Sequence, residues 1–419
     1  MERRVVITGL GTVSPLGNTV EETWQAAKNG KSGIDRITLF DASDSPVSIA
    51  GEVKNFDFST YSLEPRVRRK MARFSQFLLA ASIQAVSDAG YTKKSIAQER
   101  AGIIAGNCLG GQDASESGFG KYFNPDVGPH KMSPLSIPMM ISNEAAAHVS
   151  IYYGLHGISW TVNTACAAGT DALALAAQLI RSGRLDMCIS GGTESAVTGF
   201  CVSSFYALQA LSYHFNDTPQ KACRPFDRDR DGFIIGEGSA VLMLEELEHA
   251  RKRGAHIYAE IAGSGSSSDA YHVTAPRKDG SIAALAIQDA LTDAGMKPED
   301  IQYYNAHGTS TVANDTSESK MIHAVFGKHS EKLHISSTKS MTGHMMGAAG
   351  AIEALFCVKA VQEGFIPPTI NLDNPDVENG CDLNYTPNTG INAEINAAAS
   401  ASLGFGGHNS CIIIKKYIY

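Results

Sequence analysis

Long apolar runs are absent from this chain of 419 residues. No window approaches the ~18 consecutive apolar residues that a membrane-spanning helix needs. The apolar run after the N-terminal Met1–Arg4 is also shorter than the about 7–15 residues of a secretory signal. No two of the eight cysteines have C-x-x-C spacing, and a chain of this length does not depend on disulfides. We therefore expect a cytoplasmic protein with no membrane segment.

Basic residues are too few for a general nucleic-acid-binding protein. Lys and Arg total 35 against 43 Asp and Glu, which gives a net charge of −8. Binding along a phosphate backbone requires clustered positive charge, so we expect no nucleic-acid partner. Hydrophobic residues make up 43% and charged residues 19% of the chain. That balance is typical of a folded globular protein and excludes a disordered one.

Short β-branched runs that end near glycine alternate with alanine-rich segments along the chain. The expected strands are Val5–Gly9, Ala101–Gly106, Ile158–Thr164, Asp186–Gly191, Ala240–Leu244, Ile257–Ala262, Ile335–Thr338, Ala398–Leu403 and Ser410–Lys415. The expected helices include Phe74–Ala89, Gly169–Ser182, Ile282–Ala294 and Gly347–Glu363. The alternation predicts an α/β protein, and the continuous apolar strands predict largely parallel, buried sheets.

The two halves of the chain resemble each other weakly. Three pairs of segments correspond in the same order: Val5–Gly11 with Ala259–Gly265, Thr164–Gly169 with Thr338–Gly343, and Ile189–Glu194 with Leu403–His408. The offset differs from pair to pair, which indicates an old duplication with unequal insertions rather than a solenoid. We place the two halves at residues 1–255 and 256–419 and expect them to pack as one unit.

Two motifs resemble ligand-binding loops but are incomplete. Gly9-Leu10-Gly11 follows the first expected strand, yet Ser14 replaces the third glycine of a dinucleotide-binding loop. A pair of turn glycines is therefore favoured over a nucleotide site. Asp227–Gly232 matches the start of a calcium loop, but Gly238 stands where such a loop needs a bidentate glutamate. Its interleaved arginines favour a charged turn in which they pair with the aspartates.

Cys166 lies between an apolar strand and a helix, among small residues that leave room for a substrate. A cysteine at a helix N-terminus feels the positive end of the helix dipole, which lowers its pKa and favours the nucleophilic thiolate. Backbone N–H groups at such a turn can also hold an oxyanion. Most free cysteines are simply buried apolar side chains, and that is our interpretation of the other seven.

His307 and His344 each follow an expected strand and lie among glycine and threonine residues. A solitary histidine is usually structural, and ligation of a metal by this pair is an alternative. No carboxylate stands at the helical i+3 or i+4 spacing of known zinc motifs, so we expect no metal. One cysteine and two histidines at separate strand ends favour acyl transfer through a thioester, with histidine as proton donor or base.

The densest basic cluster is Arg66-Val67-Arg68-Arg69-Lys70, followed by Arg73. Such a run is usually a solvated helix face. In an acidic chain it can also dock an acidic partner, and both interpretations stay open on composition alone.

These motifs resemble the elongating, type II β-ketoacyl-acyl-carrier-protein synthases over nearly the whole chain. The resemblance runs from Arg4–Gly11 to Gly404–Asn409 and includes Arg224–Asp227, Arg230–Phe233 and Asp269–His272. It implies a thiolase-like fold, in which two duplicated α/β halves form five layers (αβαβα), usually in a dimer. It also implies an acyltransferase that extends an acyl chain by two carbons through decarboxylative Claisen condensation with malonyl-carrier protein.

The resemblance assigns a catalytic set. Cys166 would carry the acyl chain as a thioester, while His307 and His344 would promote decarboxylation and stabilise the enolate oxygen. Lys339 would pair with Glu353 and keep the two histidines oriented and correctly charged. The backbone N–H groups of Cys166 and Phe405 would form the oxyanion hole, and Phe405 would also gate the two half-reactions.

The remaining assignments concern substrates and partners. Thr309 and Thr311 would bind the phosphopantetheine arm, and Leu109 would line the acyl pocket. Arg66, Arg69 and Lys70 would dock the acyl carrier protein, which is acidic. Because the substrates are carried on phosphopantetheine, the resemblance implies no bound cofactor.

Several positions depart from the fatty-acid pattern. Gln209 stands where an arginine that aids carrier docking is usual. Ser136 and Glu144 lie in a stretch that is typically more apolar and close to the dimer contact. Asn314 replaces the common glycine before Asp315. These departures concern substrate and partner and leave the catalytic set intact.

The departures keep two hypotheses open. One is a homodimeric ketosynthase of fatty-acid synthesis. The other is the catalytic subunit of a type II polyketide synthase, in a heterodimer with a ketosynthase-like chain-length factor. An inactive chain-length factor would lack Cys166, and a coenzyme A thiolase would have a cysteine in place of Phe405, so both of these are disfavoured.

Overall fold

The computed structural model describes residues 3–61 and 63–418. The main sheet consists of β1 (Val5–Val13), β4 (Ala101–Gly106), β5 (Ser159–Val162), β6 (Met187–Glu194), β7 (Gly238–Glu246), β8 (Ala259–Ser268), β9 (Tyr303–Asn305), β10 (His334–Ser336), β13 (Ala397–Gly404) and β14 (His408–Lys415). Two small sheets pair β2 (Asp35–Arg36) with β3 (Ile49–Ala50) and β11 (Phe365–Ile366) with β12 (Ile391–Asn392). The helices are α1 (Val20–Lys28), α2 (Pro65–Arg68), α3 (Arg73–Asp88), α4 (Lys93–Ile96), α5 (Gln112–Phe123), α6 (Ser136–Met140), α7 (Glu144–Tyr153), α8 (Ala168–Arg181), α9 (Gly199–Ala207), α10 (Leu247–Lys252), α11 (Ser281–Ala294), α12 (Val312–Phe326), α13 (Lys339–Thr342) and α14 (Ala349–Glu363).

The strand order of the main sheet shows the duplication directly. The order is β5-β4-β6-β7-β1 in the N-terminal half and β10-β9-β13-β14-β8 in the C-terminal half. When the strands of each half are numbered along the chain, both orders read 3-2-4-5-1. β1 and β8 join the two halves through antiparallel pairs such as Val5 with Ile261. The predicted duplication is confirmed, while the division at residue 255 stays a prediction.

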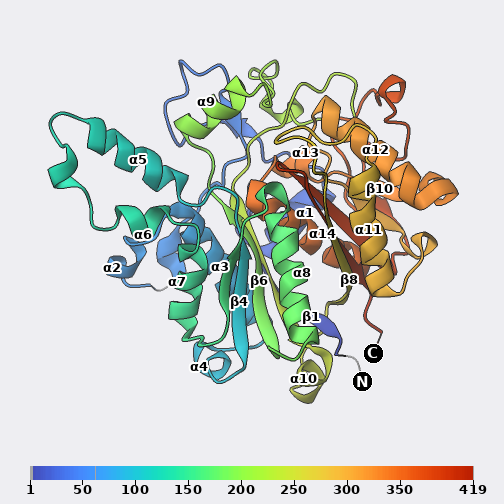
Figure 1. Ribbon diagram of the computed structural model, residues 1–419, viewed down its shortest axis with the longest axis horizontal. Coiled ribbons are helices and arrows are strands. Elements are labelled where there is room, and N and C mark those ends of the chain that lie inside the picture. The colour runs from blue at the N-terminus through green and yellow to red at the C-terminus, as the bar shows by residue number, and fades with distance from the viewer. Residues whose placement is uncertain (1–2, 62, 419) are drawn as a thin grey trace.

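Two helices lie between the halves and form the middle layer. α8 and α14 contact each other, and each also contacts strands of both halves (Figure 1). α14 can occupy this place because it is apolar nearly all round and buried along most of its length. α3 with α7 and α11 with α12 cover the outer faces. The expected five-layer arrangement is therefore confirmed. Within the described part of the chain, no helix has the length and hydropathy to span a bilayer.

The prediction of largely parallel sheets is wrong. β4 pairs in parallel with β5 and β6, and β9 pairs in parallel with β10 and β13. β1, β7, β8 and β14 instead join their neighbours antiparallel. Continuous apolar runs identify strands that are buried on both faces, but burial alone does not fix strand direction. β9 was also missed, because Tyr303–Asn305 is short and has no β-branched residue.

Paired glycines in β1 and β8 let the outer helices approach the sheet. A Cβ atom at Gly9 would lie 2.1 Å from the carbonyl oxygen of Ala85 in α3, and one at Gly263 would lie 2.3 Å from that of Ala290 in α11. Gly9 and Gly11 lie inside β1, so their interpretation as turn glycines is wrong. They are needed because any side chain would collide with the helix backbone.

We expect Gly9→Ala to lower the free energy of unfolding by about 2 kcal/mol, because the added methyl group must displace α3 from the sheet. Gly118→Ala, within α5, is the matched control, since a Cβ atom there meets nothing within 4 Å. That control should be neutral or stabilising by up to about 1 kcal/mol. Urea unfolding of both variants measures the difference, and equal stabilities would contradict the packing role of Gly9.

Candidate active site

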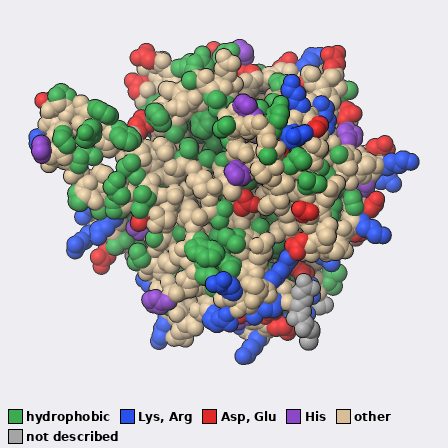
Figure 2. All heavy atoms as spheres, viewed as in Figure 1, with side chains coloured by type: hydrophobic (Ala, Val, Ile, Leu, Met, Phe, Trp, Pro, Cys, Tyr) green, Lys and Arg blue, Asp and Glu red, His purple; other side chains and the backbone are tan. Residues whose placement is uncertain are grey.

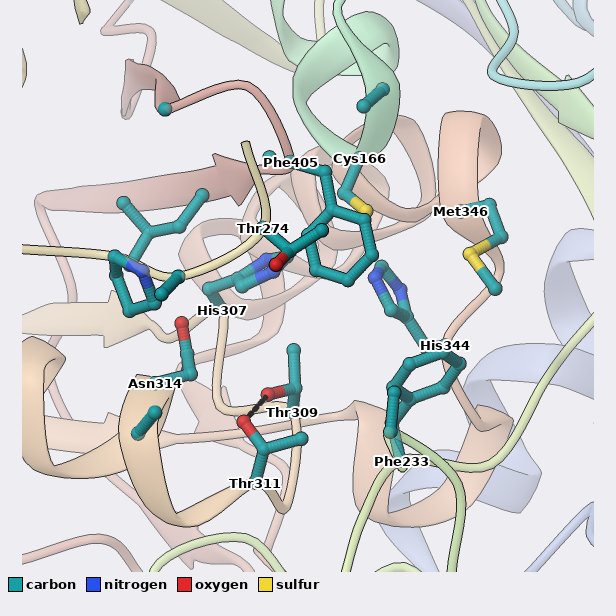
Figure 3. A pocket seen from close by; sticks show the side chains of 18 of the residues that line it. Cys166, Phe233, Thr274, His307, Thr309, Thr311, Asn314, His344, Met346 and Phe405 are labelled. Atoms are coloured by element: carbon teal, nitrogen blue, oxygen red, sulfur yellow. Dashed lines mark hydrogen bonds between the residues drawn. The ribbon is translucent and has the colours of Figure 1, made fainter. Parts of the chain in front are cut away.

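One cavity of about 290 Å³ collects half of the predicted site residues, and they come from both halves of the chain. The predicted residues that line it are Cys166, His307, Thr309, Thr311, His344 and Phe405. Figure 3 shows the Phe405 ring in the middle of this cavity, with Cys166 above it and the two histidines on either side. A thiol and two imidazoles therefore face a common space.

The turn that carries Cys166 is a short 3₁₀ segment, Ala165–Ala167, between β5 and α8. Ala165 has φ 51°, in the left-handed region that residues with a side chain rarely adopt. The hydroxyl of Thr164 donates a hydrogen bond of 2.5 Å to Asp171 in the first turn of α8. This contact ties the strained turn to the helix and holds Cys166 at the helix N-terminus.

The repeat alignment around Cys166 is wrong in detail. The C-terminal counterpart of its turn is the 3₁₀ segment Met346–Ala348 before α14, and not the segment Thr338–Gly343. Met346 also has a positive φ, 46°, as Ala165 does. The insertion between β10 and α14 holds α13 and His344, which is why the residue-by-residue match failed.

The environment of Cys166 contradicts one sequence-based expectation. Burial raises the pKa of its thiol to about 11, although the Lys339 ammonium and a hydrogen bond from the Phe405 backbone N–H lower it. Desolvation thus outweighs the effect expected of the helix N-terminus. The resting Cys166 side chain is a neutral thiol, and the Phe405 N–H donates toward its sulfur.

Lys339 fixes the protonation of His307. The Lys339 side chain is 1% exposed, forms an ion pair with Glu353 of α14, and places Nζ 3.2 Å from Nδ1 of His307. An ammonium group has only donors, so Nδ1 must accept and the proton of neutral His307 lies on Nε2. Burial and the Lys339 charge hold the pKa values of His307 and His344 well below the usual range. Both histidines are therefore neutral.

The two imidazole rings are held at right angles. Their centroids lie 5.2 Å apart with an interplanar angle of 86°, and the His344 ring also packs edge-on against Phe233. The backbone N–H of His344 donates to the carbonyl of Ile234 at 2.7 Å. This bond anchors the loop after α13 to the segment that follows α9, so that the second histidine faces the first.

Glu318 of α12 holds the backbone of the His307 turn, and the sequence analysis missed it. Its two carboxylate oxygens accept the N–H groups of His307 and Gly308, each at 2.7 Å. Burial raises the pKa of Glu318 to about 7. The available signal was an acidic residue in the helix after the His307 motif, but its contact with the turn depends on the fold.

Glu194, at the end of β6, is a second buried acid that was missed. It accepts the N–H of Cys108 at 2.8 Å and that of Gly347 at 3.2 Å, and burial raises its pKa to about 7. One carboxylate therefore joins the loop after β4 to the turn before α14. Both loops contribute to the cavity wall, through Cys108 and Met346.

Some predicted site residues lie away from this cavity. Leu109 packs in the apolar cluster that contains Cys166, but the neighbouring Cys108 is the residue that lines the cavity. Arg66, Arg69 and Lys70 are exposed on and just after α2. The acyl-pocket and docking assignments stay predictions.

The calcium-like segment is a charged turn, as the sequence indicated, but its buried ion pairs are with residues outside the segment rather than between its own arginines and aspartates. Asp227 accepts from the Arg224 guanidinium at 3.0 Å, and Arg230 binds Asp376 at 2.7 Å and lies 3.5 Å from Asp315. These buried pairs join the turn to the first turn of α12. Among residues 3–61 and 63–418, no three His, Cys, Asp or Glu side chains are grouped so that they could hold a metal ion.

Comparison with known families agrees with this geometry. Residues 2–250 match the model of the β-ketoacyl synthase N-terminal domain, and residues 258–373 match that of the C-terminal domain. The chain belongs to the β-ketoacyl synthase family. Two similar proteins of this family are the 3-oxoacyl-[acyl-carrier-protein] synthase 2 of Synechocystis sp., 46% identical over 416 residues, and that of Staphylococcus aureus (strain COL), 43% identical over 415 residues. Each alignment covers 99% of both chains.

Solved β-ketoacyl synthase structures share the whole fold. The ishigamide ketosynthase/chain length factor superposes with a TM-score of 0.93 at 35% identity and covers 100% of both chains. A β-ketoacyl synthase from Burkholderia phymatum STM815 superposes with a TM-score of 0.92 at 34% identity. The superposition covers 99% of this chain and 100% of that structure's chain. The chain is therefore a thiolase-like ketosynthase and an acyltransferase by family.

The high thiol pKa makes a direct prediction for this β-ketoacyl synthase. Iodoacetamide reacts with thiolate, so the alkylation rate of Cys166 should rise about tenfold per pH unit between pH 7 and pH 10. Lys339→Met should slow alkylation at every pH, because the Lys339 charge lowers the pKa of Cys166. Lys359→Met, a lysine of α14 paired with Glu363, is the control. Peptide mass spectrometry follows the reaction, and a rate that levels off below pH 8 would contradict the neutral-thiol state.

Proposed function

We propose that the chain is an elongating β-ketoacyl-acyl-carrier-protein synthase in which Cys166 carries the acyl chain. The observation that supports this most strongly is the arrangement of one thiol and two neutral imidazoles around a single cavity. Neutral imidazoles can donate to a developing negative charge, and a thiol can form the acyl-enzyme thioester. The named relatives catalyse the same class of reaction.

In the first half-reaction, the sulfur of Cys166 attacks the thioester carbonyl of an acyl-carrier protein. The thiol proton ends on the departing carrier sulfur, so no proton is gained or lost overall, and the Phe405 N–H stabilises the charge that develops on the Cys166 sulfur. The carbonyl oxygen becomes an oxyanion, for which the N–H groups of Cys166 and Phe405 are the proposed donors. Collapse of this intermediate releases the carrier thiol and leaves acyl-Cys166.

In the second half-reaction, a malonyl thioester enters beside the acyl group. Loss of CO₂ leaves an enolate, whose oxygen accepts hydrogen bonds from Nε2–H of His307 and from His344. The enolate carbon attacks the acyl-Cys166 carbonyl, the carbon–sulfur bond breaks, and the sulfur takes up one proton from water, so this half-reaction consumes one proton overall. The products are a 3-ketoacyl thioester longer by two carbons, CO₂ and free Cys166.

Lys339, Glu353 and Phe405 have supporting roles in this scheme. The Lys339 ammonium keeps the His307 proton on Nε2, where it can face the enolate, and Glu353 neutralises that buried charge. The Phe405 ring lies between Cys166 and the histidines in Figure 3, so it must turn aside before both substrates can fit. This is the proposed gate between the half-reactions.

The proposed carrier of both substrates is an acyl carrier protein, whose phosphopantetheine arm would pass Thr309 and Thr311. One of the similar structures is a type II ketosynthase in complex with its acyl-carrier protein, 36% identical with a TM-score of 0.91. The exposed cluster Arg66, Arg69 and Lys70 offers positive charge to such an acidic partner. No further cofactor enters the scheme, and we place it in the cytoplasm, where free cysteines persist.

The proposed partner subunit is a second ketosynthase-like chain. The arm formed by α5 and α6 stands out from the body with apolar side chains on its surface (Figures 1 and 2). Phe119, Tyr122 and Phe123 are 57%, 48% and 76% exposed there, which favours burial against a subunit. We favour a homodimer in fatty-acid synthesis, because the similar 3-oxoacyl synthases reach 46% identity. A heterodimer with a chain-length factor is the alternative, since one solved relative is such a pair.

The function is tested with acyl- and malonyl-carrier proteins and intact-mass measurement of enzyme and carriers. Wild type should form acyl-Cys166 and release a carrier longer by one two-carbon ketoacyl unit. Cys166→Ala should lose the covalent acyl group and at least about a thousandfold in rate. Cys381→Ala, a buried cysteine outside the cavity, is the control. A full acyl load on Cys166→Ala would refute the nucleophile, and extension only after a homologous subunit is added would favour the polyketide alternative.

Reversal of the basic cluster tests carrier docking. The double variant Arg66→Glu, Arg69→Glu should raise the KM for acyl-carrier protein by about tenfold or more, because two attractive contacts become repulsive. The KM for acyl-pantetheine, which has no protein partner, should not change. Lys94→Glu, an exposed reversal on α4, is the control. An unchanged KM for acyl-carrier protein would contradict the docking role and would mean that the cluster is an ordinary solvated surface.

A further inference from the structure

Asn314 places an amide group in the cavity. It lies in the first turn of α12, is 8% exposed, and lines the cavity with Thr309 and Thr311. Figure 3 shows its side-chain oxygen directed into the open space beside His307. The side chain therefore adds a polar group to the wall along which the thioester arm enters.

The orientation of this amide is fixed by two acids behind it. Its nitrogen donates to Asp315 Oδ1 at 3.1 Å and to Glu318 Oε2 at 3.3 Å, which uses both N–H bonds. Glu318 Oε2 also accepts the Gly308 N–H at 2.7 Å, so a flipped amide would place the Asn314 oxygen against another acceptor, which is unfavourable. Oδ1 of Asn314 is thus the atom that faces the cavity, and no donor within residues 3–61 and 63–418 bonds to it.

The neighbouring threonines supply the opposite kind of group. The hydroxyls of Thr309 and Thr311 lie 2.9 Å apart, so one of them donates a hydrogen bond to the other. The hydroxyl that accepts still has its own proton free to donate. Asp269, which also lines the cavity, already has hydrogen-bond donors. Its carboxylate accepts from the Asn409 side-chain amide at 2.8 Å and from the Arg277 backbone N–H at 3.1 Å. This part of the wall therefore offers one hydroxyl donor and one amide acceptor side by side.

We propose that Asn314 is a specificity-determining residue that accepts a hydrogen bond from an amide N–H of the substrate's pantetheine arm, while a threonine hydroxyl donates to the carbonyl of the arm. This inference rests on the proposed function. A secondary amide has one donor and one acceptor, and Asn314 with the threonine pair presents their complement. A glycine at this position leaves the amide N–H without that acceptor.

The test pairs Asn314→Gly with substrates that lack one N–H. Three malonyl donors are compared on pre-acylated enzyme: the pantetheine thioester, and two analogues in which one or the other amide N–H is replaced by oxygen. Wild type should lose about fivefold to tenfold in kcat/KM with one analogue, which is the usual range for one hydrogen bond. With the parent thioester, Asn314→Gly should have a kcat/KM that is lower than that of wild type by the same factor. Replacing the parent by that analogue should not lower the kcat/KM of Asn314→Gly any further.

Lys320→Gly, on the exposed side of α12, controls for the effect of glycine on the helix. Equal losses in kcat for all three donors would mean that Asn314 acts only through Glu318 on His307, and would overturn the proposal. The proposal would also be overturned if the analogue lowered the kcat/KM of Asn314→Gly by as much as it lowers that of wild type. Turnover of the parent thioester by wild type tests the proposed function separately. An inactive wild type would contradict both the proposed function and the role of Asn314.

Discussion

The buried contact of Lys339 with Glu353 and His307 is the interaction on which the site depends. A lysine that is 1% exposed loses nearly all its hydration, so it requires a carboxylate partner, and α14 supplies Glu353. With that charge in place, Nδ1 of His307 has a donor and its proton must lie on Nε2. The same positive charge lowers the pKa values of both histidines and of Cys166. One paired ammonium therefore lowers the pKa values of three side chains around the cavity, although burial has the larger effect on each of them.

The duplicated fold explains how these groups come together. α8 and α14 lie in the middle layer, and each begins after a 3₁₀ turn that contains a residue with positive φ, Ala165 or Met346. The N-terminal copy of this turn carries Cys166, the proposed nucleophile. The C-terminal copy has Gly347 beside Met346, and the preceding insertion carries His344. Two equivalent helix starts have thus diverged: one carries Cys166, and the other follows the insertion that carries His344.

Much of this was predictable from the sequence because it depends on local pattern. The apolar runs located nine of the ten strands of the main sheet, and the motifs around Cys166, His307 and His344 identified the cavity. Strand direction was not predictable, since an apolar run reports burial alone. The pKa of Cys166 was also mispredicted, because a local helix argument omits the desolvation that the surrounding layers impose. Glu194 and Glu318 were missed because their partners are distant backbone N–H groups.

The central claim is that Lys339 holds His307 as a neutral imidazole with its proton on Nε2. The most direct measurement is ¹⁵N NMR of the protein labelled at histidine, between pH 6 and pH 8, with His307→Gln used to assign the signal. We expect one protonated and one unprotonated ring nitrogen for His307 across this range, and a change in this pattern in Lys339→Met. An imidazolium at pH 7, or a proton on Nδ1, would contradict it.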